Sequence, residues 1–243
     1  MPQVLEGIIA SEKAGNKLLA VLIDPEKFIP STAKEFLKKI PFLTTHIFIG
    51  GSTVIPEDLE NCTKAIKAET SLPVILFPGD HRQISNKADA LLFLSLLSGR
   101  NPDYLIEQQV RAVPLIRKTQ LEVIPTAYLL IDGGKECAVE RVSKTRPLSQ
   151  NDISEIVDTA LAGYYAGKKL IYLEAGSGAL NPVSPEIISA VKEAVDLPLI
   201  VGGGIRTSEQ LEEAYNAGAD LVVIGTAFEN GSFQCSENTA FKN

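Results

Sequence analysis

Cysteine, tryptophan and histidine are scarce in this 243-residue chain. The three cysteines, Cys62, Cys137 and Cys235, are odd in number, far apart and never in C-x-x-C spacing, which predicts neither a disulfide framework nor a zinc cage. A composition of 45% hydrophobic and 22% charged residues also excludes a disordered or collagen-like chain. We therefore expect a globular protein in a reducing, cytoplasmic environment.

Positive charge and long apolar runs are lacking as well. Against 30 Asp and Glu the chain has 23 Lys and Arg, a net charge of −7, which excludes DNA and RNA as main partners. The most apolar stretch, Ala88–Leu97, is too short to span a bilayer, and residues 1–15 lack the core of a signal peptide. We expect no secretion and no transmembrane segment; transient membrane contact stays open.

What the chain does have is a series of short apolar, β-branched segments between helical patterns. These segments are nearly continuous in hydrophobicity, as in parallel strands buried on both faces. Eight of them predict an α/β fold, a single-domain (β/α)8 TIM barrel over residues 1–243. The expected strands are Leu18–Ile23, His46–Ile49, Val74–Phe77, Ala90–Leu94, Leu121–Thr126, Leu170–Leu173, Leu199–Val201 and Leu221–Ile224.

Capping residues mark several of the helices. Asn101-Pro102-Asp103 opens one that Pro114 should kink or shorten, and three more are expected over Ser149–Ala166, Ser184–Val195 and Thr207–Ala217.

Three places depart from a regular barrel. His81–Lys87 leaves room only for a shortened helix or a turn after the third strand, and residues 229–243 lack an apolar period, which predicts a truncated end. Between Tyr128 and Leu148 lies an insertion at the carboxyl end of the fifth strand. Loops at that end carry the chemistry of TIM barrels.

The seventh and eighth strands both end in glycine. The seventh runs into Gly202-Gly203-Gly204 and the eighth into Gly225-Thr226. Glycines let backbone N–H groups approach an anion, and many barrels hold a phosphate between these two loops. The pattern predicts a phosphate site; the alternative is that the glycines only form tight turns.

The sixth strand ends in Tyr172-Leu173-Glu174 followed by Ala175-Gly176-Ser177-Gly178. The strand period of two places Tyr172 and Glu174 on one face, and Ser177 and Gly178 extend the anion site. Glu174 is a candidate general base that would accept a proton as a new bond forms. The alternative is a structural ion pair.

The first strand ends at Asp24-Pro25-Glu26-Lys27, and the second at Gly50-Gly51-Ser52-Thr53. One carboxylate and one hydroxyl are too few for an all-protein metal cage, but they suit Mg²⁺, which recruits phosphate oxygens from its substrate. A plain turn or cap at Asp24 is an equal alternative. For the unpaired His46 and His81 a structural role is favoured.

Taken together, these segments resemble the geranylgeranylglyceryl phosphate synthase family of TIM-barrel prenyltransferases. The resemblance extends from about Lys17 to Phe228 and is specific in combination. It is carried by Asp24-Pro25-Glu26-Lys27, Gly50-Gly51-Ser52, Phe77-Pro78-Gly79, the run from Ser95 to Pro102, the run from Tyr172 to Gly178, Gly202-Gly203-Gly204 and Gly225.

The resemblance implies transfer of a geranylgeranyl group from its diphosphate to the 3-hydroxyl of sn-glycerol 1-phosphate, which forms the first ether bond of archaeal-type lipids. It places Mg²⁺ on Asp24 and Ser52, and it makes Glu174 the proton acceptor. The residues it implies for glycerol phosphate are Tyr172, Leu173, Glu174, Ala175, Gly176, Ser177, Gly178, Gly203, Gly204, Gly225 and Thr226. Family members form dimers or hexamers, so we expect a homo-oligomer.

One departure from the family's pattern bears on the identity of the prenyl donor. Shorter bacterial members of the family carry a lysine two positions before the metal aspartate, where this chain has Leu22, so it resembles the branch found in archaea and some bacteria. That branch generally uses the geranylgeranyl donor. The departure leaves open which cation, if any, assists the phosphates, and Lys27, Arg100 and Arg206 are candidates. A longer donor such as heptaprenyl diphosphate, an isomerase or synthase of sugar or indole phosphates, and a noncatalytic phosphate-binding barrel remain alternatives.

Overall fold

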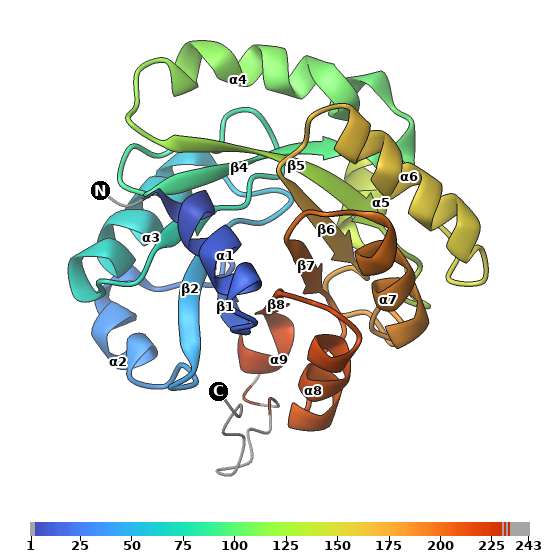
Figure 1. Ribbon diagram of the computed structural model, residues 1–243. Coiled ribbons are helices and arrows are strands. Elements are labelled where there is room, and N and C mark those ends of the chain that lie inside the picture. The colour runs from blue at the N-terminus through green and yellow to red at the C-terminus, as the bar shows by residue number, and fades with distance from the viewer. Residues whose placement is uncertain (1–2, 230, 232, 234–243) are drawn as a thin grey trace.

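The computed structural model describes residues 3–229, 231 and 233, and in them eight parallel strands close into a barrel in chain order, with β8 pairing with β1 (Figure 1). The strands are β1 (Leu18–Ile23), β2 (Thr44–Ile49), β3 (Val74–Leu76), β4 (Ala90–Leu96), β5 (Glu122–Leu130), β6 (Leu170–Glu174), β7 (Leu199–Gly202) and β8 (Leu221–Ile224). The predicted TIM barrel and its eight strands are confirmed. The predicted end of the fifth strand was wrong, because β5 continues four residues past Thr126.

Helices surround the barrel, and α1 lies across the end where the strands begin (Figure 1). The α-helices are α1 (Val4–Lys13), α2 (Ala33–Leu37), α3 (Pro56–Glu69), α4 (Gln108–Ile116), α5 (Ala138–Ser143), α6 (Ile153–Tyr165), α7 (Pro185–Ala194), α8 (Ser208–Asn216) and α9 (Thr226–Glu229). Short 3-10 turns, η1 (Pro30–Thr32) and η2 (Leu97–Gly99), and a π-helical turn, η3 (Asp103–Glu107), complete the elements. Among the described residues, no helix is long and apolar enough to cross a membrane.

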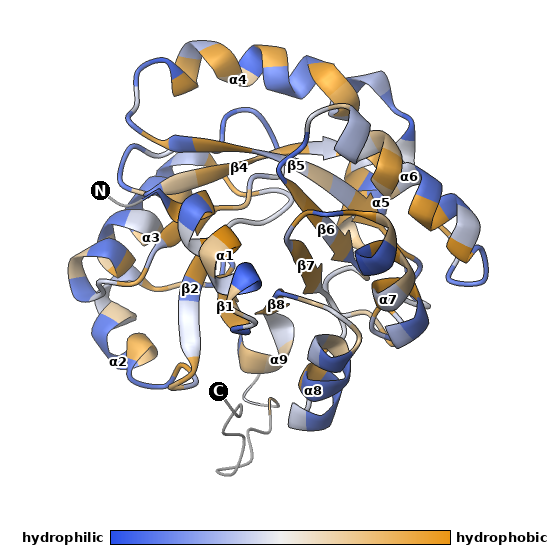
Figure 2. Ribbon diagram, viewed as in Figure 1, coloured by the Kyte–Doolittle hydropathy of each residue, from blue (hydrophilic) through white to orange (hydrophobic). Residues whose placement is uncertain are grey.

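Strand alternation sorts the core into two layers. Phe48, Leu92 and Tyr172 belong to the cluster inside the barrel, which Val4 and Ile8 of α1 close at one end. Their neighbours in sequence face outward and pack beneath the helices. In Figure 2, β6 and β7 are accordingly orange, whereas β2, which begins with three polar residues, is pale over much of its length. Packing on both faces buries most of the strand residues, which explains why the strand sequences are nearly continuous apolar runs.

Capping explains where most of the predicted helices begin. Ser184 accepts a hydrogen bond from the N–H of Ile187 at 3.4 Å, and Thr207 accepts one from Gln210 at 3.3 Å, so these two predicted starts are confirmed. The predicted start at Ser149 was wrong. Asp152 caps α6 instead, by accepting from the N–H of Glu155 at 3.0 Å.

The irregular connections lie near the carboxyl ends of the strands. The chain between β3 and β4 forms turns and contains no helix, which agrees with the short turn expected at His81–Lys87 rather than with a shortened helix. The predicted insertion after β5 contains α5. Pro114 lies within α4, which ends two residues later at Ile116. The expected truncated end at residues 229–243 falls almost wholly outside the described residues.

Candidate active site

A cavity of about 580 Å³ opens where the strands end. It brings together the two groups of residues that the sequence singled out, those of the phosphate loops and those of the metal corner. The residues of the predicted site that line it are Asp24, Ser52, Glu174, Ser177, Gly178, Gly203, Gly204, Gly225 and Thr226. A volume of this size is typical of a small-molecule site.

The glycine loops form one side of this cavity. Gly203 and Gly204 have φ values of +82° and +76°, a region that favours glycine because it has no Cβ. Across from them, the hydroxyls of Ser177 and Thr226 lie 3.1 Å apart, so the loops after β6 and β8 meet. Backbone N–H groups, two hydroxyls and the start of α9 thus surround a space suited to a phosphate.

The same glycines leave room for Glu174. A Cβ on Gly203 would lie 2.6 Å from Oε1 of Glu174, and a Cβ on Gly202 would lie 2.6 Å from its Oε2. Any larger residue at either position would therefore displace the carboxylate. This spatial requirement is a second reason for the glycines, beside the approach of a phosphate.

Glu174 is almost completely buried, and its Oε1 accepts a hydrogen bond from the N–H of Gly176 at 2.8 Å. Burial raises the pKa of Glu174 to about 7, while the nearby Tyr172 hydroxyl and the Gly176 N–H oppose that rise. Among the described residues it has no cationic partner within ion-pair distance, so the alternative of a structural ion pair is not supported. A carboxyl group that titrates near neutral pH can serve as a general base.

Four residues that the resemblance assigned to glycerol phosphate do not line the cavity: Tyr172, Leu173, Ala175 and Gly176. The Leu173 and Ala175 side chains face the helices. The Ala175 N–H donates to the carbonyl of Gly202, so it is already engaged. Tyr172 is fully buried, and its hydroxyl lies beside Glu174 without meeting the geometry of a hydrogen bond to any described group.

An aromatic cluster, of which Phe77 and Tyr128 line the cavity, was missed by the sequence analysis. Phe77 stacks on Tyr172 with ring centroids 5.1 Å apart, and Tyr128 meets Tyr172 edge to face at 5.4 Å. Tyr128 pairs with Tyr172 in the sheet register, so a correct end for β5 would have predicted the contact. The rings place an apolar floor below the carboxylate and thereby promote its burial.

Asp24 and Ser52 follow β1 and β2, the strands next to β8 in the barrel, and both line the cavity. Oδ1 of Asp24 accepts from the N–H of Glu26 at 3.1 Å, and Oδ2 lies 3.2 Å from Nζ of Lys27. A Cβ on Gly51 would lie 3.1 Å from Oδ1 of Asp24, which shows how closely the loop that carries Ser52 approaches the carboxylate. Asp24 thus forms the predicted turn and also lies close to the loop that carries Ser52, so the two interpretations of Asp24 are compatible.

No described cluster of three or more His, Cys, Asp or Glu residues could hold a metal alone. One carboxylate and one hydroxyl nevertheless provide hard oxygen donors beside a cavity wide enough for phosphate groups, which fits Mg²⁺.

Two of the three cations left open by the sequence reach the cavity. Lys27 also pairs with Glu229 at 3.0 Å, while Arg206 donates to backbone carbonyls, including that of Gly204 at 3.3 Å. Arg100 does not line the cavity and lies 3.7 Å from Glu155. Leu22 makes the wall of the cavity beside Gly225 apolar.

An apolar arm of the cavity extends from this polar part. Leu92, Leu94 and Leu96 of β4 line it with Val139 and Val142 of α5, and Tyr128. The helix that a regular barrel would place between β3 and β4 is absent here, and α5 lies within the insertion predicted after β5. The cavity is thus lined by polar residues of the predicted site and by apolar side chains of β4 and α5.

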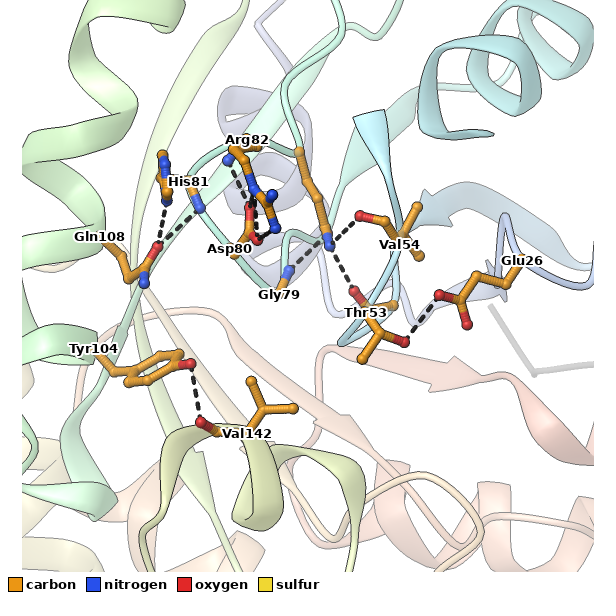
Figure 3. A network of polar contacts seen from close by, with 12 residues as sticks. Glu26, Thr53, Val54, Gly79, Asp80, His81, Arg82, Tyr104, Gln108 and Val142 are labelled. Atoms are coloured by element: carbon orange, nitrogen blue, oxygen red, sulfur yellow. Dashed lines mark hydrogen bonds and ion pairs between the residues drawn. The ribbon is translucent and has the colours of Figure 1, made fainter. Parts of the chain in front are cut away.

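The histidines have ordinary contacts. His46 is buried far from the cavity, where burial lowers its pKa to about 4, and its Nδ1 lies 2.8 Å from the Thr45 hydroxyl. His81 lies at the rim, with Nδ1 2.9 Å from Oε1 of Gln108 (Figure 3). The structural role predicted for His46 is supported by this burial. Cys62 and Cys137 are free thiols and are buried; Cys235 lies outside the described residues.

A closed barrel of eight parallel strands, with a cavity and glycine loops at the carboxyl ends of the strands, defines a TIM-barrel protein with a candidate phosphate site. The model of the PcrB family matches residues 12–241, and the chain belongs to this family.

Relatives agree with the resemblance seen in the sequence. The chain is 59% identical to the geranylgeranylglyceryl phosphate synthase of Zunongwangia profunda, over 96% of this chain and all of that protein. It is 44% identical to the enzyme of the same name from Pyrococcus abyssi, over 90% and 86% of the two chains.

A solved structure is similar as well. The crystal structure of (S)-3-O-geranylgeranylglyceryl phosphate synthase from Thermoplasma acidophilum, in complex with substrate sn-glycerol-1-phosphate, has a TM-score of 0.86 and 38% identity, and the match covers 94% of this chain and 92% of that one. The family predicted from the sequence is thereby confirmed.

Proposed function

We propose that this chain is a prenyltransferase that moves a geranylgeranyl group from geranylgeranyl diphosphate to the 3-hydroxyl of sn-glycerol 1-phosphate, giving geranylgeranylglyceryl phosphate. The observation that carries the proposal is the position of Glu174, a buried carboxyl between the glycine loops and the apolar arm. Membership of the PcrB family and relatives bearing the synthase name support it.

The glycine loops bind the phosphate of the acceptor. Backbone N–H groups of Gly203, Gly204 and Gly225 and the hydroxyls of Ser177 and Thr226 hold it at the start of α9. Because the loops fix one end of the small acceptor, its hydroxyl is directed toward Glu174. Such fixing of two reactants in one cavity supplies a large part of the rate enhancement.

Glu174 accepts the hydroxyl proton as the new C–O bond forms. The bond between the allylic carbon and the diphosphate oxygen breaks with its electron pair on the diphosphate, so charge and atoms balance. The apolar arm holds the prenyl chain and excludes water from the allylic carbon as it becomes cationic. Tyr128 lines the cavity and packs edge to face on the buried Tyr172, beside the carboxylate.

Mg²⁺ belongs to this proposal, held by Asp24 and Ser52 together with oxygens of the donor. When bound it would stabilise the negative charge that develops on the leaving diphosphate. Lys27 adds positive charge at the same corner, and Arg206 does so beside the glycine loops. An assembly of several copies and a cytoplasmic location are also part of the proposal.

The test is product formation from labelled sn-glycerol 1-phosphate with geranylgeranyl diphosphate and with shorter and longer donors, in Mg²⁺ and in chelator. An organic-extractable product that needs Mg²⁺ is expected, and the donor preference gives the chain length, with heptaprenyl diphosphate as the longer alternative. Phosphate binding without product from any donor would contradict the proposal and favour a noncatalytic or isomerase barrel.

A further inference from the structure

Gln83 lies in the helix-free connection between β3 and β4, yet its side chain is completely buried. Its Oε1 accepts from the N–H of Gly79 at 2.8 Å. Its Nε2 donates to the carbonyl of Gly51 at 3.0 Å and to that of Val54 at 3.1 Å. One amide therefore joins two loops that border the cavity, with both of its polar ends engaged.

These bonds surround the residue proposed as a metal ligand. Gly51 and Val54 flank Ser52, and a Cβ on Gly79 would lie 2.8 Å from Cα of Ser52. On the other side, the Thr53 hydroxyl donates to Glu26 at 2.9 Å, two residues after Asp24. Figure 3 shows Gly79, Val54, Thr53 and Glu26 in one network of polar contacts.

Gln83 suits this position through its chemistry. Two carbonyls need a donor and one N–H needs an acceptor, a combination that an amide satisfies and that neither methionine nor glutamate does. A regular barrel would support the loop after β3 with a helix, but here the residues between β3 and β4 form turns only. The buried amide of Gln83 supports the loop after β3 in place of a helix.

We propose that Gln83 is the positioning residue of the cation and diphosphate corner: it fixes the loop of Ser52 at the distance from Asp24 that binding of Mg²⁺ with a diphosphate requires. Gln83 does not line the cavity, so it acts through the backbone of Gly51 and Val54. This inference rests on the proposed function.

Gln150 offers a matched control. Its Nε2 donates to the carbonyls of Asp132 at 2.8 Å and Pro182 at 3.2 Å, and its Oε1 accepts from the N–H of Ser184 at 3.0 Å. It joins the loops after β5 and β6, away from Ser52. Replacing either glutamine by methionine thus removes the same kinds of bonds on different sides of the cavity.

The experiment compares Gln83→Met, Gln83→Glu and Gln150→Met with the unaltered protein. Calorimetric titration with inorganic pyrophosphate and Mg²⁺ measures the donor corner, and separate titration with sn-glycerol 1-phosphate measures the acceptor side. Both Gln83 variants should bind Mg²⁺–pyrophosphate about 10- to 100-fold more weakly, as when supporting residues around metal ligands are lost. Their glycerol phosphate affinity should stay within about twofold, which also shows that they are folded, and Gln150→Met should keep its pyrophosphate affinity.

Two results would overturn the inference. One is an unchanged affinity of the Gln83 variants for Mg²⁺–pyrophosphate, and the other is an equal loss for both ligands, which would mean general support of the fold. The binding readout is separate from turnover. If the unaltered protein binds Mg²⁺–pyrophosphate and forms no prenylated product, the proposed function fails while the role of Gln83 is still decided by the titrations.

Discussion

Where the strands begin, α1 closes the barrel with paired charges; where they end, the cavity holds a buried carboxylate with no cationic partner among the described residues. At the first end, Nζ of Lys192 lies 2.5 Å from Glu12 of α1 and 2.8 Å from Asp220. The Glu122 carboxylate accepts from the N–H groups of Val4 and Leu5 and so caps α1. These charged groups are thus paired, although the buried Thr44 hydroxyl at the start of β2 has no hydrogen-bond partner among the described residues.

At the second end, matching is incomplete. Among the described residues the Tyr172 hydroxyl has no hydrogen-bond partner, and burial raises the pKa of Glu174. Such unmatched groups destabilise a fold unless a ligand satisfies them. The difference teaches that one end serves stability and the other binding and chemistry, as in TIM barrels generally.

The largest expected effect tests the chemistry at the cavity end. Glu174→Gln keeps the volume of the side chain and an oxygen that can accept from the Gly176 N–H, but it cannot take a proton from the acceptor. Turnover should fall about 100- to 10,000-fold, the usual range for removal of a general base. Glycerol phosphate binding, followed by thermal shift, should change by less than about threefold. Retained turnover would show that Glu174 is not the base.

The glycine loops give the next effect. In Gly203→Ala, the new Cβ would lie 2.6 Å from Oε1 of Glu174 and 2.7 Å from the N of Gly176, at a φ of +82°. We expect glycerol phosphate affinity to fall about 10- to 100-fold, because loss of precise positioning near a reacting group has effects of this size. A titration of each variant with glycerol phosphate measures it.

Gly167→Ala is the matched control for that change. Gly167 has the same φ of +82°, but no atom lies within 4 Å of its missing Cβ. Alanine there should destabilise the fold by about 1 to 2 kcal/mol through backbone strain and leave ligand affinity unchanged. Equal losses of affinity in both variants would attribute the effect to strain alone.

Some features of the two ends could be predicted from the sequence, and others could not. The eight strands were predictable because strands buried on both faces are apolar at nearly every position, and the phosphate loops because glycine itself is the signal. Helix α1 was missed, since its ten residues gain stability mainly from packing on the barrel mouth. The pKa of Glu174 and the role of Gln83 depend on burial, which only the closed barrel creates.

Disrupting the charge network at the end covered by α1 should lower the stability of the fold and leave the activity unchanged. Burial alone would lower the pKa of Lys192, but its hydrogen bonds to Asp220 and Glu12 raise it, so it stays charged at neutral pH. Lys192→Met leaves two partly buried carboxylates facing each other and should lower the free energy of unfolding by about 2 to 4 kcal/mol. Urea denaturation measures this, and KM values should not change.

Lys38→Met is the control for Lys192. Lys38 pairs with Glu35 at 2.8 Å, but 60% and 66% of the two side chains is exposed. An exposed pair contributes less than about 1 kcal/mol, so the control should unfold almost like the unaltered protein. A similar loss in both variants would contradict the assignment of a matched, stabilising network to the end covered by α1.

The smallest expected effect concerns the stability of the cavity end and its pH dependence. The folded state holds the Glu174 proton up to about pH 7, whereas the unfolded chain releases it near 4.5, so ionisation destabilises the fold as pH rises between these values. Glu174→Gln removes this penalty and should raise the free energy of unfolding at pH 8 by on the order of 1 to 3 kcal/mol. Below pH 4.5 the difference in the free energy of unfolding between the variant and the unaltered protein should disappear, because both the folded and the unfolded state then hold the proton.

Denaturation series at pH 4 and pH 8 measure this difference, with Glu35→Gln as an exposed control. The same difference in the free energy of unfolding at both pH values would mean that the added stability comes from packing and not from the buried charge.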